Sequence, residues 1–424
     1  MSIATRDRRA PSSWTASARL IVAAVLFCAP AVAGCTEQAS PSPAPVTACD
    51  APVVRGTCAS IGTGGQQWRY ALLRAPRSTT RTVLVDFGGP GLAVLAGNGR
   101  LQAFRDAFPR LADGANLLAL EEPWVRRTPS PACRTALRRY YHDVREVGPY
   151  ASHAVDVRYS CRLSPSGEWG FEPAGFDRAI RAVLRQERLR LDGFVGMSFG
   201  SVRLSYLTDP RPAWSVLVRP FPVGATGTEV IDSRAQRTAA IVLESGNGTA
   251  VTANSDNAGR FDLLSALVEL GYLDDRQAAD LLPHLTHGDA PALAHTLAGQ
   301  LWQTYGDGDL SAGFLAYLDE MCRVAAPWPG SAAPAGDLLT VAVGTVLAAA
   351  HRPCGSETPP RPVVSGTDRM CLVVSATDPV ASEALVRRQY AALKQVRWVR
   401  SAVRSHSSLD GLAGCLDQVA AAGR

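Results

Sequence analysis

Lysine is almost absent from this chain, since Lys394 is the only one among 424 residues. A phosphate-binding P-loop requires a lysine directly after its glycines, and a Ser/Lys dyad or a Schiff-base enzyme requires one in its site. The sequence therefore excludes a P-loop protein and argues against lysine-dependent catalysis.

Metal-binding patterns are also missing. The ten cysteines form no C-x-x-C pair and no close cluster with histidine. His284 and His287 are three residues apart with Asp289 close behind, but without nearby cysteines we interpret them as surface or lid residues. We therefore predict no metal and no cofactor.

The chain lacks a strong excess of one charge. Its formal net charge is +5, and residues 1–34 contain four arginines and one aspartate, so the remainder carries +2. This balance leaves no basic footprint for nucleic acid. We expect a small peptide or ester as substrate and no nucleic-acid partner.

No apolar run is long enough to span a membrane. The uncharged run from Leu20 to Ala33 is short, follows four arginines and ends in Val32-Ala33-Gly34-Cys35. Small residues before a cysteine are typical of a lipoprotein signal peptide, so we predict that residues 1–34 are removed and that Cys35 carries the lipid. The alternative is an ordinary secretory signal that is cut near Ala33.

The segment after Cys35 has the composition of a tether. Residues 36–48 are rich in proline, serine and alanine and contain almost no bulky apolar residue. We predict that residues 35–60 hold an exported domain at the outer face of the cell membrane. Secretion into the medium is the alternative.

The cysteine count agrees with export. Without Cys28 in the signal and the lipidated Cys35, eight cysteines remain, and an even set favours four disulfides. Eight cysteines allow 105 connectivities, so the count alone does not give the pairs.

Apolar strands alternate with amphipathic helices along most of the chain. The predicted strands are 68–73, 82–87, 117–120, 193–196, 215–218, 371–375 and 396–400. Several are continuous apolar runs, which are typical of a buried parallel sheet, and residues 230 to 362 read as helices without strands. We predict an α/β fold with a mostly parallel central sheet, a core at 61–229 and 365–424, and an inserted helical lid at 230–364.

The pentapeptide Gly196-Met197-Ser198-Phe199-Gly200 follows a short apolar strand and precedes helical spacing of apolar residues. A G-x-S-x-G sequence in this context predicts a nucleophile elbow, in which a sharp strand-to-helix turn exposes the serine. Ser198 is therefore the candidate nucleophile.

Candidates for the acid and the base follow in the order that an α/β-hydrolase uses. Asp378 comes at the end of the strand 371–375, where catalytic groups of open α/β sheets collect, and His406 comes after the last strand. We predict that Asp378 orients His406 and that His406 activates Ser198. Glu229, which follows the strand 215–218, is the rival acid.

The oxyanion hole has a candidate in Phe87-Gly88-Gly89-Pro90-Gly91, directly after a strand. Glycines let the backbone approach a substrate, and we expect the N–H groups of Gly89 and Phe199 to bind the oxyanion. As a phosphate cradle this turn fails, because Pro90 removes one donor.

GGPG after a strand, G-x-S-[YF]-G, a late Asp-Pro-Val and a histidine shortly before a C-terminal cysteine together resemble the secreted α/β-hydrolases of the tripeptidyl-aminopeptidase-like group, with proline iminopeptidases as more distant relatives. The resemblance runs from about Trp68 to Cys415 and implies Ser198, Asp378 and His406 as the triad. It also implies the release of short peptides from free N-termini.

The resemblance, together with local spacing, favours sequential disulfide pairs. Those in the lid and at the C-terminus resemble pairs of that group. The four predicted pairs are Cys49–Cys58, Cys133–Cys161, Cys322–Cys354 and Cys371–Cys415.

Two departures from the group concern its substrate pocket. Leu120-Glu121-Glu122-Pro123 replaces an Asp-Pro-Arg-Gly type of turn, and Arg219-Pro220 stands where Asp-Gly is common. We therefore expect a membrane-anchored serine hydrolase, with aminopeptidase action on short peptides as the first hypothesis. An esterase or amidase for a specialised small molecule is the second, and a binding lipoprotein without turnover is the third. The sequence does not indicate the substrate or the oligomeric state.

Overall fold

The computed structural model describes residues 56–95, 99–125, 127–148, 153–163, 173–245, 257–304, 308–325, 327–328, 336–355, 364 and 366–421. The predicted signal peptide, Cys35, Cys49 and most of the tether lie outside these residues. None of the described helices is long and apolar enough to span a membrane.

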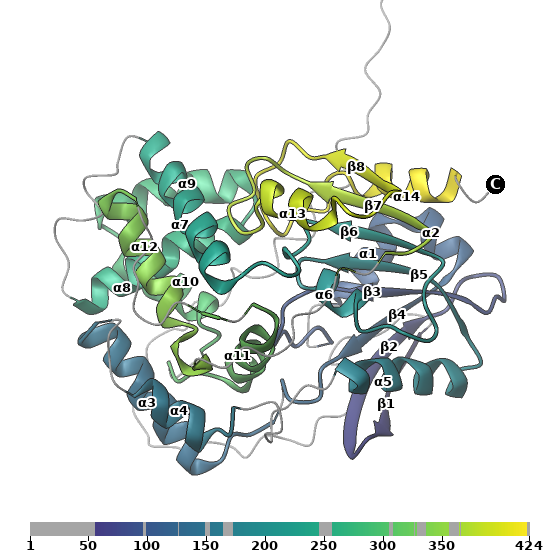
Figure 1. Cartoon of the computed structure of the whole chain (residues 1–424), viewed down its shortest axis with the longest axis horizontal. Helices are drawn as coiled ribbons and strands as arrows, with labels where there is room; N and C mark the ends of the chain where they lie inside the picture. The colour runs from purple at the N-terminus through teal and green to yellow at the C-terminus, as the bar shows by residue number, and fades with distance from the viewer. Residues whose placement is uncertain are drawn as a thin grey trace, which may run out of the picture.

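Eight strands form one sheet with the order β1-β2-β4-β3-β5-β6-β7-β8 (Figure 1). β2 pairs antiparallel with β1 and β4, and all other neighbours pair parallel. With helices on both faces, this is the predicted α/β-hydrolase fold. The strands are β1 (Gly56–Thr63), β2 (Gln66–Leu73), β3 (Arg81–Asp86), β4 (Asn116–Glu121), β5 (Arg190–Met197), β6 (Trp214–Val218), β7 (Arg369–Val374) and β8 (Val396–Arg400).

The first strand begins within residues 35–60, for which the composition predicts a tether. β1 runs from Gly56 to Thr63 and pairs with the whole of β2. Its sequence GTCASIGT has only one bulky apolar residue. β1 therefore joins the sheet through backbone pairing at its edge and not through an apolar sequence pattern.

The central strands are buried on both faces, which explains their continuous apolar runs. In β3, Leu84 packs into one hydrophobic cluster while its neighbours Val83 and Val85 pack into another. The first cluster includes α5 (Pro173–Gln186), and the second includes α1 (Arg100–Ala107), α2 (Pro109–Gly114) and α14 (Leu412–Ala421). The sheet therefore separates two apolar cores.

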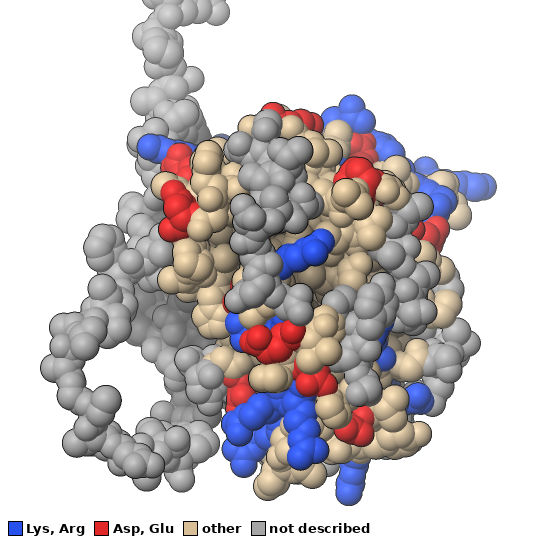
Figure 2. All heavy atoms as spheres, turned by 90° about the vertical axis from the view of Figure 1, so that its left-hand side faces the viewer, with Lys and Arg blue, Asp and Glu red and all other residues tan. Residues whose placement is uncertain are grey.

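A helical insertion, α7 to α12, lies between β6 and β7 in the chain and beside the sheet in space (Figure 1). Its helices are α7 (Gly227–Glu244), α8 (Asn257–Glu269), α9 (Asp275–His287), α10 (Pro291–Leu301), α11 (Ala312–Val324) and α12 (Leu338–Ala349), with the short η3 (Leu270–Tyr272) after α8. η4 (Arg352–Cys354) follows α12. Lys/Arg and Asp/Glu side chains are interspersed on this side of the molecule (Figure 2).

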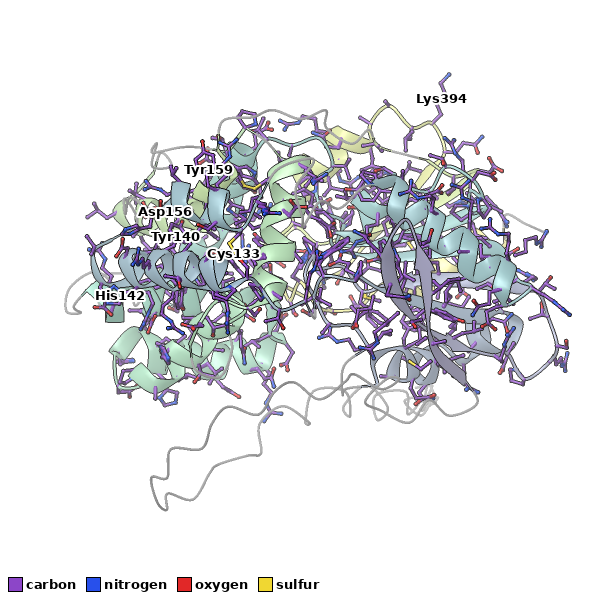
Figure 3. All side chains as sticks on the ribbon, turned by 90° about the horizontal axis from the view of Figure 1, so that it is seen from below. Cys133, Tyr140, His142, Asp156, Tyr159 and Lys394 are labelled. Carbon is purple, nitrogen blue, oxygen red and sulfur yellow. A yellow bond between two sulfur atoms is a disulfide. The ribbon has the colours of Figure 1, made fainter. Side chains whose placement is uncertain are left out.

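Two helices from the first part of the chain join the insertion. α3 (Pro131–Glu146) and α4 (Ala154–Ser160) precede β5, yet they lie on the insertion's side of the molecule (Figures 1 and 3). The Tyr140 hydroxyl donates to the Ala349 carbonyl, and Arg145 forms an ion pair of 2.8 Å with Asp262. The predicted core at 61–229 includes both helices.

Three of the predicted disulfides are present. Cys133–Cys161 joins α3 to the end of α4, Cys322–Cys354 joins α11 to η4, and Cys371–Cys415 joins β7 to α14. Cys49 lies outside the described residues, so the pair Cys49–Cys58 remains a prediction. Lys394 points away from the molecule into solvent (Figure 3).

Candidate active site

Ser198 lies in the sharp turn between β5 and α6 (Gly200–Leu204). Its φ of 48° is in the left-handed region that side chains normally avoid, as expected for a nucleophile elbow. Neighbouring glycines make this turn possible, because a Cβ on Gly196 would lie 2.4 Å from the Phe194 ring and 3.1 Å from the Gly200 carbonyl carbon. The strained turn presents the hydroxyl at the carboxyl end of β5.

His406 reaches the serine from the loop after β8. Its Nε2 lies 2.8 Å from Ser198 Oγ, and its backbone N–H donates to the Gly271 carbonyl at 2.9 Å. The Tyr272 ring meets the imidazole edge to face, with 5.5 Å between the centroids. The residues of η3 thus fix the position of a buried imidazole from the side of the insertion.

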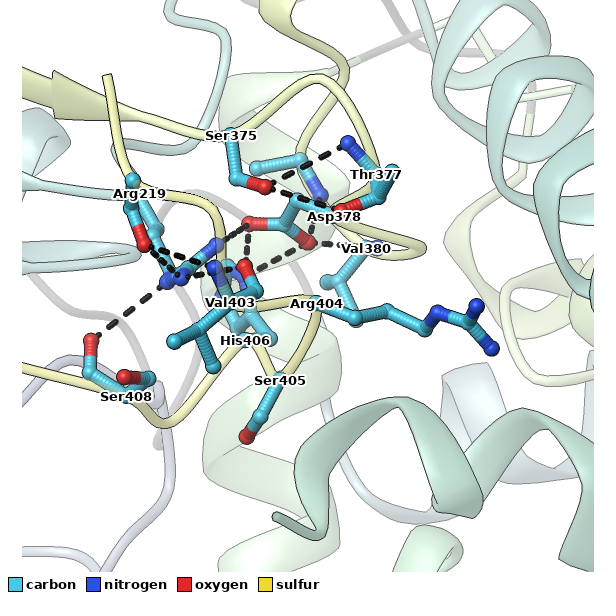
Figure 4. A network of polar contacts seen from close by, with 12 residues as sticks. Arg219, Ser375, Thr377, Asp378, Val380, Val403, Arg404, Ser405, His406 and Ser408 are labelled. Atoms are coloured by element: carbon cyan, nitrogen blue, oxygen red, sulfur yellow. Dashed lines mark hydrogen bonds and ion pairs between the residues drawn. The ribbon is translucent and has the colours of Figure 1, made fainter. Parts of the chain in front are cut away.

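Asp378 completes this row of side chains (Figure 4). Its two carboxylate oxygens lie 3.1 and 3.0 Å from His406 Nδ1, and its Oδ1 accepts from the N–H groups of Val380 and Ala381. Burial by itself would raise the pKa of this carboxyl. The attraction of His406, the hydrogen bonds from His406 and Ala381, and the charge of Arg219 together hold its pKa below the ordinary value. The group is therefore suited to accept from an imidazole N–H.

Glu229, the rival candidate for the acid, binds other residues and not His406. Glu229 forms a capping box with Thr226 at the start of α7 and also pairs with Arg388 at 2.5 Å. The Thr226 amide, and to a lesser degree Arg388, lower the pKa of this carboxyl. The structure brings Asp378, and not Glu229, to His406.

The predicted oxyanion turn lies against the elbow. A Cβ on Gly88 would come within 3.1 Å of Ser198 Cβ, so the turn and the serine touch. Among the described residues, neither the Gly89 nor the Phe199 amide N–H has a hydrogen-bond acceptor. Two backbone donors without partners beside a nucleophile are what an oxyanion hole requires.

A buried cluster of charged side chains binds the backbone of this turn. Arg203 donates to the Gly88 carbonyl at 3.0 Å and to Asp86 at 2.9 Å, and it pairs with Glu122. Asp86 and Glu122 accept from the N–H groups of Gly88 and Gly91. Glu122, noted in the sequence as a departure, therefore anchors the backbone of the oxyanion turn.

The cluster extends to α11 through Glu320, which lies 3.6 Å from Arg203. Burial raises the pKa of Glu320 to about 8, although the charge of Arg203 opposes this effect. The cluster therefore links the oxyanion turn to the helical insertion.

Arg219 is the residue whose role the sequence did not reveal. It follows β6 directly, is fully buried, and has a φ of 48°. Its guanidinium contacts Asp378 and the loop that carries His406 (Figure 4). The sequence indicated only that Arg219-Pro220 departs from a common pattern.

Glu269 is an acidic residue next to the backbone that holds His406. It ends α8, two residues before the Gly271 carbonyl that binds His406, and its side chain is half-buried. Burial raises its pKa to about 8, with Arg234 acting in the opposite direction. Arg234 lies over the Tyr272 ring at 5.3 Å.

The histidines considered for metal binding lie elsewhere. His284 and His287 are in α9, and His284 lies 3.6 Å from Asp289 on an exposed surface. Within the part of the chain that the structure describes, no three His, Cys, Asp or Glu side chains gather as metal ligands would.

Comparisons with known proteins give similarity to solved structures only. No protein-family model matches the chain, and no curated protein sequence does. A proline iminopeptidase-related protein from Thermus thermophilus is 15% identical, with 87% of this chain and 100% of that chain covered and a TM-score of 0.38. A proline iminopeptidase from Mycobacterium smegmatis is 11% identical, with 86% of this chain and 96% of that chain covered and a TM-score of 0.39.

A carboxylesterase from Bacillus subtilis is 9% identical to this chain, with 87% and 91% of the two chains covered and a TM-score of 0.36. These similarities concern architecture alone. With its own strand order and crossover helices, the chain has the α/β-hydrolase fold.

Proposed function

We propose that this protein is a serine hydrolase that acts by acyl transfer through Ser198, His406 and Asp378. The observation that carries the proposal is the continuous row from Ser198 Oγ through the imidazole to a buried carboxylate, with contacts of 2.8 and 3.0 Å. A serine hydroxyl is a weak nucleophile unless a base removes its proton, and this geometry supplies the base and fixes its tautomer.

The chemistry proceeds in two halves. Ser198 Oγ attacks the substrate carbonyl while His406 Nε2 takes its proton, and the N–H groups of Gly89 and Phe199 bind the oxyanion that forms. His406 then gives the proton to the leaving amine or alcohol. Water, activated by the same imidazole, hydrolyses the acyl-enzyme and frees Ser198.

Aminopeptidase action is the activity we propose first, because an acidic side chain lies next to the residues that hold His406 and could form an ion pair with a free α-amino group. Glu269 is half-buried near His406, and among the described residues it has no hydrogen-bonded partner. A substrate ammonium there would provide the opposite charge that burial of a carboxylate demands. We also propose that the protein acts outside the cell membrane, anchored through Cys35.

The triad is tested by exchange of its members one at a time. Ser198→Ala should abolish turnover and covalent labelling by a fluorophosphonate, while the fold remains intact. Asp378→Asn should lose activity by a factor on the order of 10⁴, because the imidazole would lose its orienting acceptor. Activity on a panel of peptides, N-acylated peptides and acyl esters is the measurement.

Glu229→Gln is the matched control for the acid, since glutamine also supports a capping box and the exchange removes the same charge. It should keep nearly full activity. Undiminished turnover in Ser198→Ala would contradict the hydrolase proposal at this site, and equal losses in Asp378→Asn and Glu229→Gln would contradict the assignment of the acid. If only the esters of the panel are cleaved, the proposed activity becomes that of an esterase and not of a peptidase.

A further inference from the structure

Arg219 occupies the position between the nucleophile and the acid. β6 is flanked by β5, which ends at Met197 directly before Ser198, and by β7, which precedes Asp378. The Ser198 N–H donates to the Val218 carbonyl at 2.9 Å, and the Arg219 N–H donates to the Val373 carbonyl at 2.8 Å. The backbone of Arg219 is therefore part of the platform on which the triad is built.

The guanidinium binds one member of the triad and the loop that carries another (Figure 4). Nη1 lies 3.5 Å from Asp378 Oδ2, while Nη2 donates to Ser401 Oγ at 3.0 Å and to the Val403 carbonyl at 2.8 Å. Nε makes a longer contact of 3.4 Å with the Ser408 carbonyl. One planar group thus ties the acid to both ends of the loop that presents His406.

The position of Arg219 is energetically unfavourable in two respects, backbone strain and burial of a charge, which indicates a functional role. A left-handed φ strains the backbone of any residue other than glycine. Arg219 accepts this strain, and its charged side chain is withdrawn completely from water, with Asp378 as its one ion-pair partner among the described residues. A buried charge needs strong compensation, which here comes from the residues around His406.

We propose that Arg219 is a positioning residue for the triad: its guanidinium orients the Asp378 carboxylate and the His406 loop, and its charge favours the neutral, proton-accepting form of the imidazole. The inference rests on the proposed function. Imidazolium would place a second cation beside Asp378, in a buried region where charge repulsion is weakly screened. The geometry therefore keeps the base ready to accept the serine proton.

Other charged or titratable groups lie around the imidazole and its loop, and they remain constant in the experiment. Asp378 and Tyr272 contact the imidazole itself. The others contact the residues around it: Arg234 lies over the Tyr272 ring, Glu269 ends α8 just before η3, Asp275 accepts from the Arg404 and Ser405 amides, and Asp410 accepts from the Ser401 hydroxyl.

The test measures the titration of His406 directly, in the full chain labelled with ¹³C at histidine Cε1. The His406 resonance is assigned by its absence in His406→Gln. Arg219→Met and Arg219→Gln should raise the midpoint of this titration by about one pH unit, because the neighbouring cation is gone. Arg219→Lys should leave it near the wild-type value, since a cation is retained.

Kinetics separate the two roles of the side chain. Arg219→Lys should lower kcat about tenfold or more with KM little changed, because an ammonium lacks the planar fork that reaches both acid and loop. The neutral variants should in addition shift the acidic limb of kcat/KM to higher pH. Arg237→Met is the matched control, since Arg237 binds the Ala376 and Asp378 carbonyls but not the carboxylate. It should leave the midpoint unchanged.

An unchanged His406 midpoint in both neutral variants would overturn the proposal, as would an equal shift in Arg237→Met. If the neutral variants failed to fold while Arg219→Lys folded with full kcat, Arg219 would be purely structural and the proposal would also fall. Absence of any hydrolytic activity in the wild type would instead contradict the proposed function, and the titration would still decide the electrostatic inference.

Discussion

Glu269 shows how one side chain can decide between substrate classes. A carboxyl with a pKa raised to about 8 by burial is largely protonated in the empty site at neutral pH. A bound ammonium would favour its ionised form, so binding of a free N-terminus would release a proton from Glu269. Affinity for such substrates should therefore improve as the pH rises toward about 8, where an α-amino group itself begins to lose its charge.

Glu269→Gln should raise KM for peptides with a free N-terminus about tenfold or more, because the amide cannot form the ion pair. KM for N-acylated peptides and acyl esters should not change. Steady-state kinetics on matched pairs of free and acylated substrates provide the measurement, with Glu244→Gln on the exposed end of α7 as the control. Equal effects on both members of each pair would exclude an ammonium at Glu269.

Which residues could be predicted depends on how far apart their partners lie in the sequence. Ser198 belongs to a local pattern that a strained turn requires, and the placement of Asp378 and His406 after late strands brings them to the same sheet edge. Arg219 has no such local pattern. Its partners Ser401 and Val403 follow more than 180 residues later, so its role becomes visible only once the chain is folded.

At the scale of the elements, α11 and the oxyanion turn pack at backbone contact. A Cβ on Gly91 would lie 2.1 Å from the Gly313 carbonyl oxygen, and a Cβ on Gly313 would lie 2.7 Å from that of Gly91. Neither position has room for a methyl group. The helix and the turn can approach this closely because Gly91 and Gly313 both lack a side chain.

Gly313→Ala should displace α11 from the oxyanion turn and lower the rate of Ser198 labelling, even though alanine favours a helix by about 1 kcal/mol over glycine. The labelling rate and the thermal midpoint are the measurements. Gly414→Ala in α14 is the control, because its Cβ would meet only Val399 at 4.0 Å. It should keep the labelling rate and be as stable as the wild type or more so. A Gly313→Ala protein with unchanged labelling would show that the turn tolerates movement of α11.

The prediction of elements was accurate where burial dictates the sequence and inaccurate where it does not. The interior strands β3 to β7 are apolar runs because both of their faces are covered. β1 has few apolar residues, so nothing in its sequence distinguishes it from a tether. For α3, the amphipathic pattern indicates a buried face but not whether the sheet or α8 covers it.

At the scale of the whole molecule, the open property is its location in the cell. We predict that Cys35→Ser blocks lipidation and leaves precursor or shifts the protein from the membrane fraction to the medium. A single acyl chain binds membranes only marginally, whereas several chains give stable attachment. Fractionation of cells, with mass spectrometry of the N-terminus, is the measurement.

A shortened chain that begins at Ala48 should be soluble and should still label at Ser198, because the first described strand starts at Gly56. Its labelling rate should match that of the full chain. Wild-type protein that is soluble, with its N-terminus at a residue other than Cys35, would contradict the anchor and return Cys35 to the disulfide count.

The ties between α3 and the helical insertion determine which parts of the chain could be exchanged during evolution or by design. The pairing of β6 with β7 spans the whole insertion, and the entropic cost of closing such a loop grows only slowly with its length. Helices could thus be swapped here at little cost to the sheet. A graft of residues 227–355 alone, however, would leave Asp262 without Arg145 and the Ala349 carbonyl without Tyr140. The transferable unit is discontinuous, and a viable chimera would need α3 and α4 from the same donor.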